Sequence, residues 1–384
     1  MKKPLLITII ILVVILALPA VNFIRWAFQE KKPMNIVILD KTVPTLDRTG
    51  HHSLVYVLTN SRFVKKDKGG SFSAAKDYYG FLPLRPVREK QFKKRDFRLT
   101  ELIELADNND ALYYTDTYGV FFNDWYQGIK KARRSRKLYG GLNNNDYLLL
   151  SEMKKRDKLV ILEYNTFDYP TAALERYKTE ELLGITSTGW VGKHYRTLDT
   201  LNVTGVPGWM PVLYRKQYRE PWSFTKPGVV LLKDNSIIVL EEGKQLTASR
   251  PEIVTTGAFA ERFKLPQTVT FENDFSIISP GTNNVVSTFN LRTTPAGDTL
   301  LSEYGIPASF PAVVQEAATQ RTYYFSGDFT TNSIPFWTSR FKSIENVKGL
   351  LYSDNPEDGR RFFWLYYKPL VSGIFTEYQM ATKK

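Results

Sequence analysis

Cysteine is absent from the 384-residue chain, and histidine occurs only at His51, His52 and His194. The absence of cysteine excludes disulfides, zinc–thiolate sites, iron–sulfur clusters and thiol nucleophiles. Two of the three histidines are adjacent, and adjacent side chains on a helix diverge by about 100°, so they do not easily face one metal ion. We therefore expect no metal site and no bound cofactor.

Several catalytic sequence motifs are also missing. The chain contains no Gly-x-Ser-x-Gly, no Walker loop and no Gly-x-Gly-x-x-Gly after its first predicted strand. It is nevertheless typical of a folded protein, with 43% hydrophobic and 24% charged residues and with 7 Trp, 22 Tyr and 24 Phe. Its length suits one large domain or two ordinary ones.

The longest apolar run lies near the N-terminus, at residues 4–24. Twenty residues of helix cover the roughly 30 Å hydrocarbon core of a bilayer. A cleaved signal sequence is the alternative, but the best cleavage site, Leu18-Pro19-Ala20, places Leu where a small residue is needed. We predict an uncleaved signal anchor that contacts the membrane through residues 4–24. The basic residues Lys2 and Lys3 favour an extracytoplasmic soluble part, although the basic residues after the run nearly balance them.

Strand and helix patterns alternate after the anchor. Short apolar runs predict buried strands at 35–40, 111–116 and 159–163. Intervening patterns predict helices over 52–60, 100–106, 144–155 (capped by Asn144) and 170–183. This alternation is typical of an α/β fold with a parallel sheet and helices on both faces, hence three layers.

Later segments are richer in strand signals. Residues 228–240 predict a hairpin, 268–291 further strands, and 321–328 a late strand that could return to the edge of the first sheet. A charged-ended aromatic run at 361–368 is too short to span a membrane and fits a core helix better than an interfacial one. We divide the chain into an anchor and linker (1–32), an α/β core (33–215), a β-rich section that is a second domain or completes the core sheet (216–335), and a helical aromatic tail (336–384).

An acid ends each of the three predicted core strands: Asp40, Asp116 and Glu163. Ligands bind at the carboxyl ends of strands in open parallel sheets, so we expect these carboxylates around one site. The structural alternative is that the acids bind loop amides or helix N-termini. The late strand also ends in an acid, and a Trp among glycines could stack on a sugar or fill the core. The predicted ligand-binding residues are Asp40, Lys41, Thr42, Asp116, Tyr118, Glu163, Asn165, Trp190 and Asp328.

Five segments carry a resemblance to a known group of proteins. They are residues 35–43 (NIVILDKTV), 113–120 (YYTDTYGV), 138–142 (LYGGL), 162–171 (LEYNTFDYPT) and 323–329 (YYFSGDF). The chain resembles uncharacterised, membrane-anchored bacterial proteins whose soluble part is similar to the class I glutamine-amidotransferase-like fold. That resemblance implies a flavodoxin-type α/β core over roughly 35–330 and a single-pass location in the bacterial cytoplasmic membrane.

The same resemblance bears on catalysis. Amidotransferases of this superfamily use a Cys on a sharp strand-to-helix turn, with a downstream His and Glu. Here the corresponding strand continues as Glu163-Tyr164-Asn165, and no Cys exists anywhere. Composition alone therefore excludes glutamine hydrolysis by that mechanism.

Positive charge is concentrated in two stretches. Residues 62–98 hold twelve Lys or Arg against four acids, and 130–137 hold six basic residues in eight, within a formal net charge of +13. Beside a bilayer such stretches suit anionic lipids or acidic envelope polymers, while a solvated basic loop is the simpler interpretation. No nucleic-acid-binding module is recognisable, so we expect no nucleic-acid partner.

Two functions from different classes remain. The first is a non-catalytic, membrane-anchored module that binds an anionic ligand, a glycan or a partner protein of the cell envelope. The alternative is an envelope glycan hydrolase whose paired carboxylates are Asp116 and Glu163. Whether Asp40, Asp116, Glu163 and Asp328 converge decides between a shared site and separate structural roles.

Overall fold

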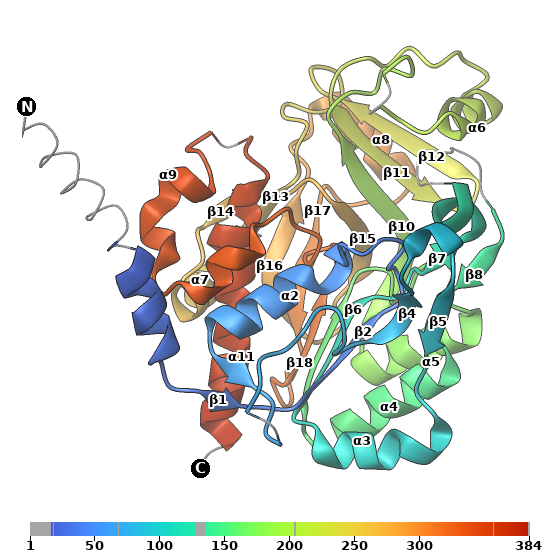
Figure 1. Ribbon diagram of the computed structural model, residues 1–384. Coiled ribbons are helices and arrows are strands. Elements are labelled where there is room, and N and C mark those ends of the chain that lie inside the picture. The colour runs from blue at the N-terminus through green and yellow to red at the C-terminus, as the bar shows by residue number, and fades with distance from the viewer. Residues whose placement is uncertain are drawn as a thin grey trace, which may run out of the picture.

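A ten-stranded mixed sheet forms the centre of the molecule (Figure 1). The computed structural model describes residues 17, 19–67, 69–127, 135–202, 205–355 and 357–382. In spatial order the strands are β14 (Thr268–Thr270), β13 (Glu252–Thr255), β16 (Asn284–Asn290), β17 (Ser309–Gln315), β18 (Thr322–Phe325), β9 (Leu159–Glu163), β6 (Ala111–Asp116), β2 (Ile36–Asp40), β4 (Tyr79–Pro83) and β5 (Phe92–Arg95).

The middle of this sheet is parallel. Strands β4, β2, β6, β9 and β18 are paired in parallel, and the flanking strands are antiparallel. If these five strands are numbered from 1 to 5 along the chain, their spatial order in the sheet is 2-1-3-4-5. This order is found in doubly wound α/β proteins. The predicted core strands are confirmed, and so is the late strand, because β18 pairs with the free side of β9. The predicted α/β class is therefore correct at this level.

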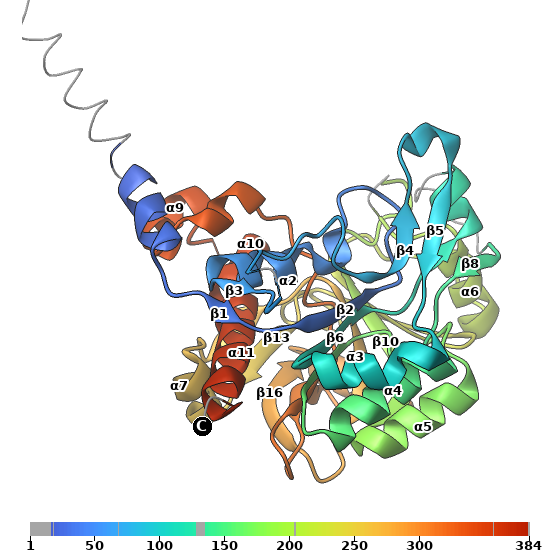
Figure 2. The same ribbon diagram turned by 60° about the horizontal axis from the view of Figure 1, so that its bottom comes forward.

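Helices pack on both faces of the sheet. On one face, α2 (Thr49–Asn60) and α11 (Lys368–Thr382) bury side chains against Ile36, Ile38 and Tyr113. On the other face, α3 (Leu102–Asn108), α4 (Asn144–Lys155) and α5 (Ala173–Leu183) cover the alternate residues of the same strands. Figure 2 shows β2 between α2 on one side and α3 on the other. Because both faces are covered, the strands are continuous apolar runs rather than alternating ones.

A second sheet extends the β-rich part. Its order is β12 (Ser236–Glu241), β11 (Gly228–Lys233), β10 (Thr186–Tyr195) and β15 (Asp274–Ser279), all antiparallel. The predicted hairpin is confirmed as β11–β12, and α6 (Trp209–Tyr218) packs on it. A single bridge, Phe275 to Gly327, joins this sheet to the end of β18. Strands from both sides of residue 215 thus share each sheet.

The C-terminal tail is part of the core. The π-helical turn η6 (Phe363–Tyr367) buries Phe363, Tyr366 and Tyr367 completely, which confirms the core interpretation of 361–368. The remaining elements are β1 (Lys32–Pro33), β3 (Phe63–Val64), η1 (Val87–Glu89), η2 (Leu99–Glu101), β7 (Val120–Phe121), η3 (Asn123–Gln127), β8 (Lys137–Tyr139), α7 (Gly257–Phe263), α8 (Pro295–Glu303), η4 (Phe336–Arg340), η5 (Ile344–Val347), α9 (Lys348–Leu351) and α10 (Arg360–Phe362).

Most of the predicted anchor falls outside the described residues, as do residues 130–134 of the second basic stretch. Residues 19–27 are helical, and within the described ranges no helix has both the length and the apolar character of a membrane span. Part of the first basic stretch forms β5, whose Lys93, Lys94 and Arg95 are exposed. Charged side chains on an edge strand oppose pairing with another sheet.

The cap of α4 differs from the predicted one by one residue. Asn143, not Asn144, accepts hydrogen bonds from the backbone N–H groups of Asn145 (2.9 Å) and Asp146 (3.0 Å). Asp146 returns the contact by accepting the N–H of Asn143, which completes a capping box.

We expect Asn143→Ala to lower the free energy of unfolding by about 1 kcal/mol, because two N–H groups lose their acceptor. The neighbouring change Asn144→Ala is the matched control, since Asn144 is exposed and makes no cap, and should alter stability by only a few tenths of a kcal/mol. Urea unfolding of the full chain in detergent measures both. Equal effects of the two substitutions would contradict this assignment.

Candidate functional site

Two of the predicted acids, Asp40 and Asp116, lie side by side at the point in the sheet where the strand connections change direction. Asp40 ends β2 and Asp116 ends the neighbouring β6, and the two residues stand opposite each other in register. The chain leaves β2 toward β4 on one side, while β6 leads toward β9 on the other. Ligands of open α/β sheets bind at this kind of switch point.

Asp40 is completely buried and paired with a histidine. Its Oδ2 lies 2.6 Å from Nδ1 of His51, and Nε2 of that ring lies 2.8 Å from the carbonyl oxygen of Ala74. Gly50 permits this contact, because a Cβ there would lie 2.6 Å from the same Oδ2. Both ring nitrogens of His51 therefore lie within hydrogen-bond distance of an oxygen, one from Asp40 and one from Ala74. His51 was not among the predicted ligand-binding residues.

Asp116 is half-buried and differs from Asp40 in its partners. It accepts the backbone N–H of Tyr118 (2.7 Å) and lies within 3.3 Å of the Asn165 amide. Burial raises the pKa of the Asp116 carboxyl well above its usual value, and the charges of Asp40 and Asp328 raise it further. Asp116 is thus partly exposed as a residue, while the surroundings of its carboxyl are mostly protein.

Glu163 has a structural set of partners. Its Oε1 accepts the Tyr113 hydroxyl at 2.5 Å, and its Oε2 accepts the N–H groups of Phe329 (2.9 Å) and Thr330 (3.1 Å) and the Thr330 hydroxyl. The side chain is fully buried. Glu163 therefore fixes the chain that follows β18, and both of its oxygens are occupied by buried donors.

Asp328 is one of four acids whose charges act on the Tyr164 phenol. Burial is the largest cause of the raised pKa of Tyr164, and the charges of four acids raise it further. We call these acids the acidic cluster: Asp116, Asp168, Asp274 and Asp328. Burial also raises the pKa of Asp328 to about 6 and that of Asp168 to about 7. Lys193 pairs with Asp274 at 2.6 Å, and this pairing raises the pKa of the ammonium.

Of the two predicted residues after β2, Lys41 pairs outside the acidic cluster and Thr42 contacts one of its members. Lys41 is 1% exposed and donates to the carbonyl of Gly141 (2.9 Å) and to the carboxylate of Asp146. Thr42 accepts the N–H of Gly119 (2.7 Å) and its hydroxyl also contacts Asp116. Lys41 thus joins the segment after β2, which also carries Thr42, to Gly141 and to Asp146 of α4.

Aromatic side chains are divided between core and surface. Trp190 is 6% exposed and packs edge-to-face on Tyr304, so it lies in the core. In contrast, Tyr118 is 36% and Tyr169 is 69% exposed, and both rings contact Phe121. Tyr118 stands two positions after Asp116 and Tyr169 directly after Asp168, so both rings are on loops that carry members of the acidic cluster.

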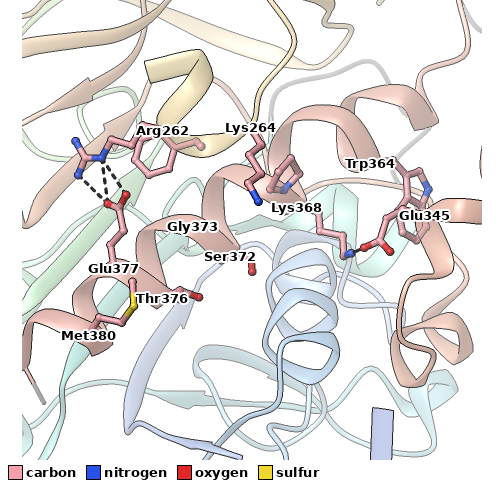
Figure 3. A pocket seen from close by; sticks show the side chains of 12 residues that line it. Arg262, Lys264, Glu345, Trp364, Lys368, Ser372, Gly373, Thr376, Glu377 and Met380 are labelled. Atoms are coloured by element: carbon pink, nitrogen blue, oxygen red, sulfur yellow. Dashed lines mark hydrogen bonds and ion pairs between the residues drawn. The ribbon is translucent and has the colours of Figure 1, made fainter. Parts of the chain in front are cut away.

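Two pockets lie away from these acids. One, of about 520 Å³, is formed by α7, η5, η6 and α11, and Figure 3 shows Lys368 turned toward Glu345 at its side. Burial lowers the pKa of Lys368 to about 7, and the ammonium contacts the carboxylate of Glu345. The other pocket, of about 610 Å³, contains His194, whose pKa burial lowers to about 4. Neither contains a predicted site residue.

Sequence reasoning missed His51, Tyr164, Asp168, Lys193 and Asp274. Asp274 opens β15 instead of closing a strand, so a rule based on strand ends does not select it. The Phe275–Gly327 bridge brings it to the end of β18. Tyr164 and Asp168 directly follow β9, and a search of the whole β9 loop for polar residues would have found both.

Nowhere in the described ranges do three His, Asp or Glu side chains come together in a way that could hold a metal ion. No protein-family model, curated protein or solved structure matches the chain.

Proposed function

We propose that this chain is a membrane-anchored, extracytoplasmic α/β module of the bacterial cell envelope that binds a glycan at the acidic cluster without catalysing a reaction. The observation that carries the proposal is the combination of partly exposed acids with exposed aromatic rings. Asp116 and Asp328 keep partial exposure despite raised pKa values, and Tyr118 and Tyr169 lie beside the cluster.

The chemistry of this group fits hydroxyl-rich ligands. Carboxylates accept hydrogen bonds from sugar hydroxyls, and a phenol offers a flat apolar face with a polar tip. An anionic ligand is disfavoured there, because like charges nearby cost energy. The basic stretch at 62–98 suits anionic lipids or polymers instead.

The lack of catalysis is supported by the turn after β9. Asn165 adopts a left-handed conformation (φ 71°) there, close to Asp116. In the amidotransferase-like proteins that the chain resembles, the nucleophile stands on such a turn. An amide is no nucleophile, so the geometry of the turn serves to aim a hydrogen-bond donor.

Anchoring is supported by the apolar run and by the contacts of the residues directly after it. Trp26 is 7% exposed, and its indole N–H donates to the carbonyl of Thr59 at 3.0 Å. The Arg62 guanidinium lies over the same ring. The chain immediately after the proposed span is thus fixed to the α/β core, which suits a single-pass anchor in the cytoplasmic membrane.

Glycan hydrolysis is the second candidate, and one observation favours it. Asp328, with a pKa of about 6, could donate a proton near neutral pH, with Asp116 as the second carboxyl. Glu163 does not serve, because four donors already occupy its oxygens.

A comparison of three kinds of sugar oligomer, which differ in charge, tests the proposal. At pH 6.5 we expect the full chain in nanodiscs to bind glucosamine oligomers about tenfold more tightly than N-acetylglucosamine oligomers, and uronate oligomers of equal length most weakly. The reason is that ammonium groups complement the carboxyl of Asp328, which is mostly ionised above its pKa of about 6. Calorimetry gives the affinities, and chromatography of the recovered oligomers reports cleavage. Cleavage would favour the hydrolase, and preference for uronates would contradict both candidates.

A further inference from the structure

An exposed apolar surface lies where the anchor joins the α/β core. On the N-terminal side, Phe23 is 43%, Ile24 52% and Phe28 86% exposed. On the C-terminal side, Trp337 is 68%, Val347 42% and Leu350 79% exposed. We call these six side chains the anchor-side surface.

The two halves of this surface are in direct contact. The backbone N–H of Lys342 donates to the carbonyl of Asn22 at 3.2 Å, and the Phe23 ring lies 6.3 Å from that of Phe341. Figures 1 and 2 both show the first helix beside α9. Asn22 belongs to the apolar run 4–24, so η4, η5 and α9 lie at the level where that run ends.

The exposure of these side chains is not a consequence of loose packing. Thr338 and Ser339, next to Trp337, are 1% and 0% exposed. Asn60 of α2 donates to the carbonyls of Ser339 and Phe341, both at 3.1 Å. The backbone on both sides of Trp337 is therefore fixed, and it holds the Trp337 side chain outward. If this surface faced only water, a polar side chain could stand at the position without loss of stability.

Basic side chains border the same surface. Arg25 is exposed on the first helix, and Arg340 and Lys348 are exposed on η4 and α9. An apolar face with Trp at its boundary and Lys or Arg around it is the pattern of a segment that lies in the membrane interface. Each basic residue close to an anionic leaflet contributes roughly 1 kcal/mol of attraction.

We propose that η4, η5 and α9 form a second, interfacial membrane contact, which inserts Trp337 and Leu350 into the headgroup region of an anionic phospholipid bilayer. This inference rests on the proposed anchor. It adds that the soluble part does not swing freely on its span: two separated points, residues 19–28 and 337–350, hold one orientation toward the bilayer. The acidic cluster then faces a fixed direction relative to the membrane.

The natural absence of cysteine gives a clean test. Trp337→Cys and Leu350→Cys place an NBD fluorophore on exposed positions of the full chain in nanodiscs with anionic phosphatidylglycerol. Val21→Cys, at a 51% exposed position in the apolar run, reports the anchor, and Leu201→Cys, at a 91% exposed apolar position before α6, is the matched control. We expect doxyl-labelled lipids to quench labels at 337, 350 and 21 about twofold or more, since interfacial segments lie only ~5–10 Å deep. The label at 201 should be unaffected.

The outcomes separate this inference from the anchor itself. Quenching at 21 without quenching at 337 and 350 would overturn the interfacial contact and leave the anchor standing. No quenching at any of the three positions would overturn both. Equal quenching at 201 and 337 would show that the labels partition by themselves, and would also reject the contact.

Discussion

Replacing Lys41 by methionine is expected to lower the free energy of unfolding by about 3–5 kcal/mol. Lys41 and Asp146 are each 1% exposed, and the ammonium is the charge that compensates this carboxylate. Burial already raises the pKa of Asp146, and Lys41 opposes that shift. Methionine fills a similar volume but leaves a buried carboxylate without its cation, and the Asp146 Oδ1 already has no hydrogen-bond partner in the described structure.

Urea unfolding of the full chain in detergent measures this loss. Lys155→Met is the matched control, since Lys155 is 65% exposed in its pair with Glu152 and should change stability by about 0.5 kcal/mol or less. Adding Asp146→Asn to Lys41→Met should recover part of the loss, because the amide oxygen still accepts the Asn143 N–H without a charge. A loss as small as that of the control would show that water reaches Asp146.

Replacing Asp328 by asparagine is expected to stabilise the protein above pH 6. The folded-state pKa of this carboxyl is raised from 3.8 to about 6, so folding favours its protonated form. The corresponding stability is complete below pH 4 and is lost as the pH rises through 6. Asparagine cannot ionise, so the free energy of unfolding of the variant should exceed that of the natural chain by on the order of 1–2 kcal/mol at pH 7.5, after allowance for partial exposure. At pH 4 the two free energies should be equal.

The comparison of unfolding free energies at the two pH values isolates this effect. Asparagine keeps an acceptor for the Thr331 N–H, which donates to Asp328 at 3.1 Å, so local geometry should survive. Asp234→Asn is the control, because Asp234 is exposed in the β11–β12 turn, where asparagine also accepts the left-handed conformation (φ 51°). A gain that is equal at pH 4 and pH 7.5 would contradict the raised pKa.

The parallel core was predictable from local patterns. Buried parallel strands require continuous apolar runs, and the runs at 36–40, 111–116 and 159–163 are unambiguous. Turn and cap residues separate them from helices, as Gly184 does by ending α5 in a left-handed conformation. The positions of the acids at strand ends were predictable for the same reason, and Asp40 and Asp116 are indeed neighbours.

The roles of those acids could not be predicted in the same way. Glu163 and Asp116 end adjacent strands with the same sequence pattern, yet Glu163 is enclosed by Tyr113 and the chain after β18, which lies 166 residues away at Phe329. Asp274 and Lys193 reach the cluster through antiparallel pairing of β10 with β15, a long-range contact without a local signal. Similarly, the glycine-flanked Trp190 packs against Tyr304, more than a hundred residues distant.

Stability and ligand binding should respond in opposite directions to the same substitution if the acidic cluster is a binding site. Natural sites keep groups whose charges destabilise the fold because those groups bind a ligand. A purely structural cluster would have no reason to keep Asp328 ionisable where asparagine is more stable.

The binding of a glucosamine hexamer to full-length Asp328→Asn in nanodiscs at pH 6.5, measured by calorimetry beside the natural chain and Asp234→Asn, tests this claim most directly. We expect the natural chain and Asp234→Asn to bind equally and Asp328→Asn to bind at least about tenfold more weakly, a loss of ~1.4 kcal/mol. Equal binding by all three chains, or no binding by the natural chain, would contradict a glycan site at the acidic cluster.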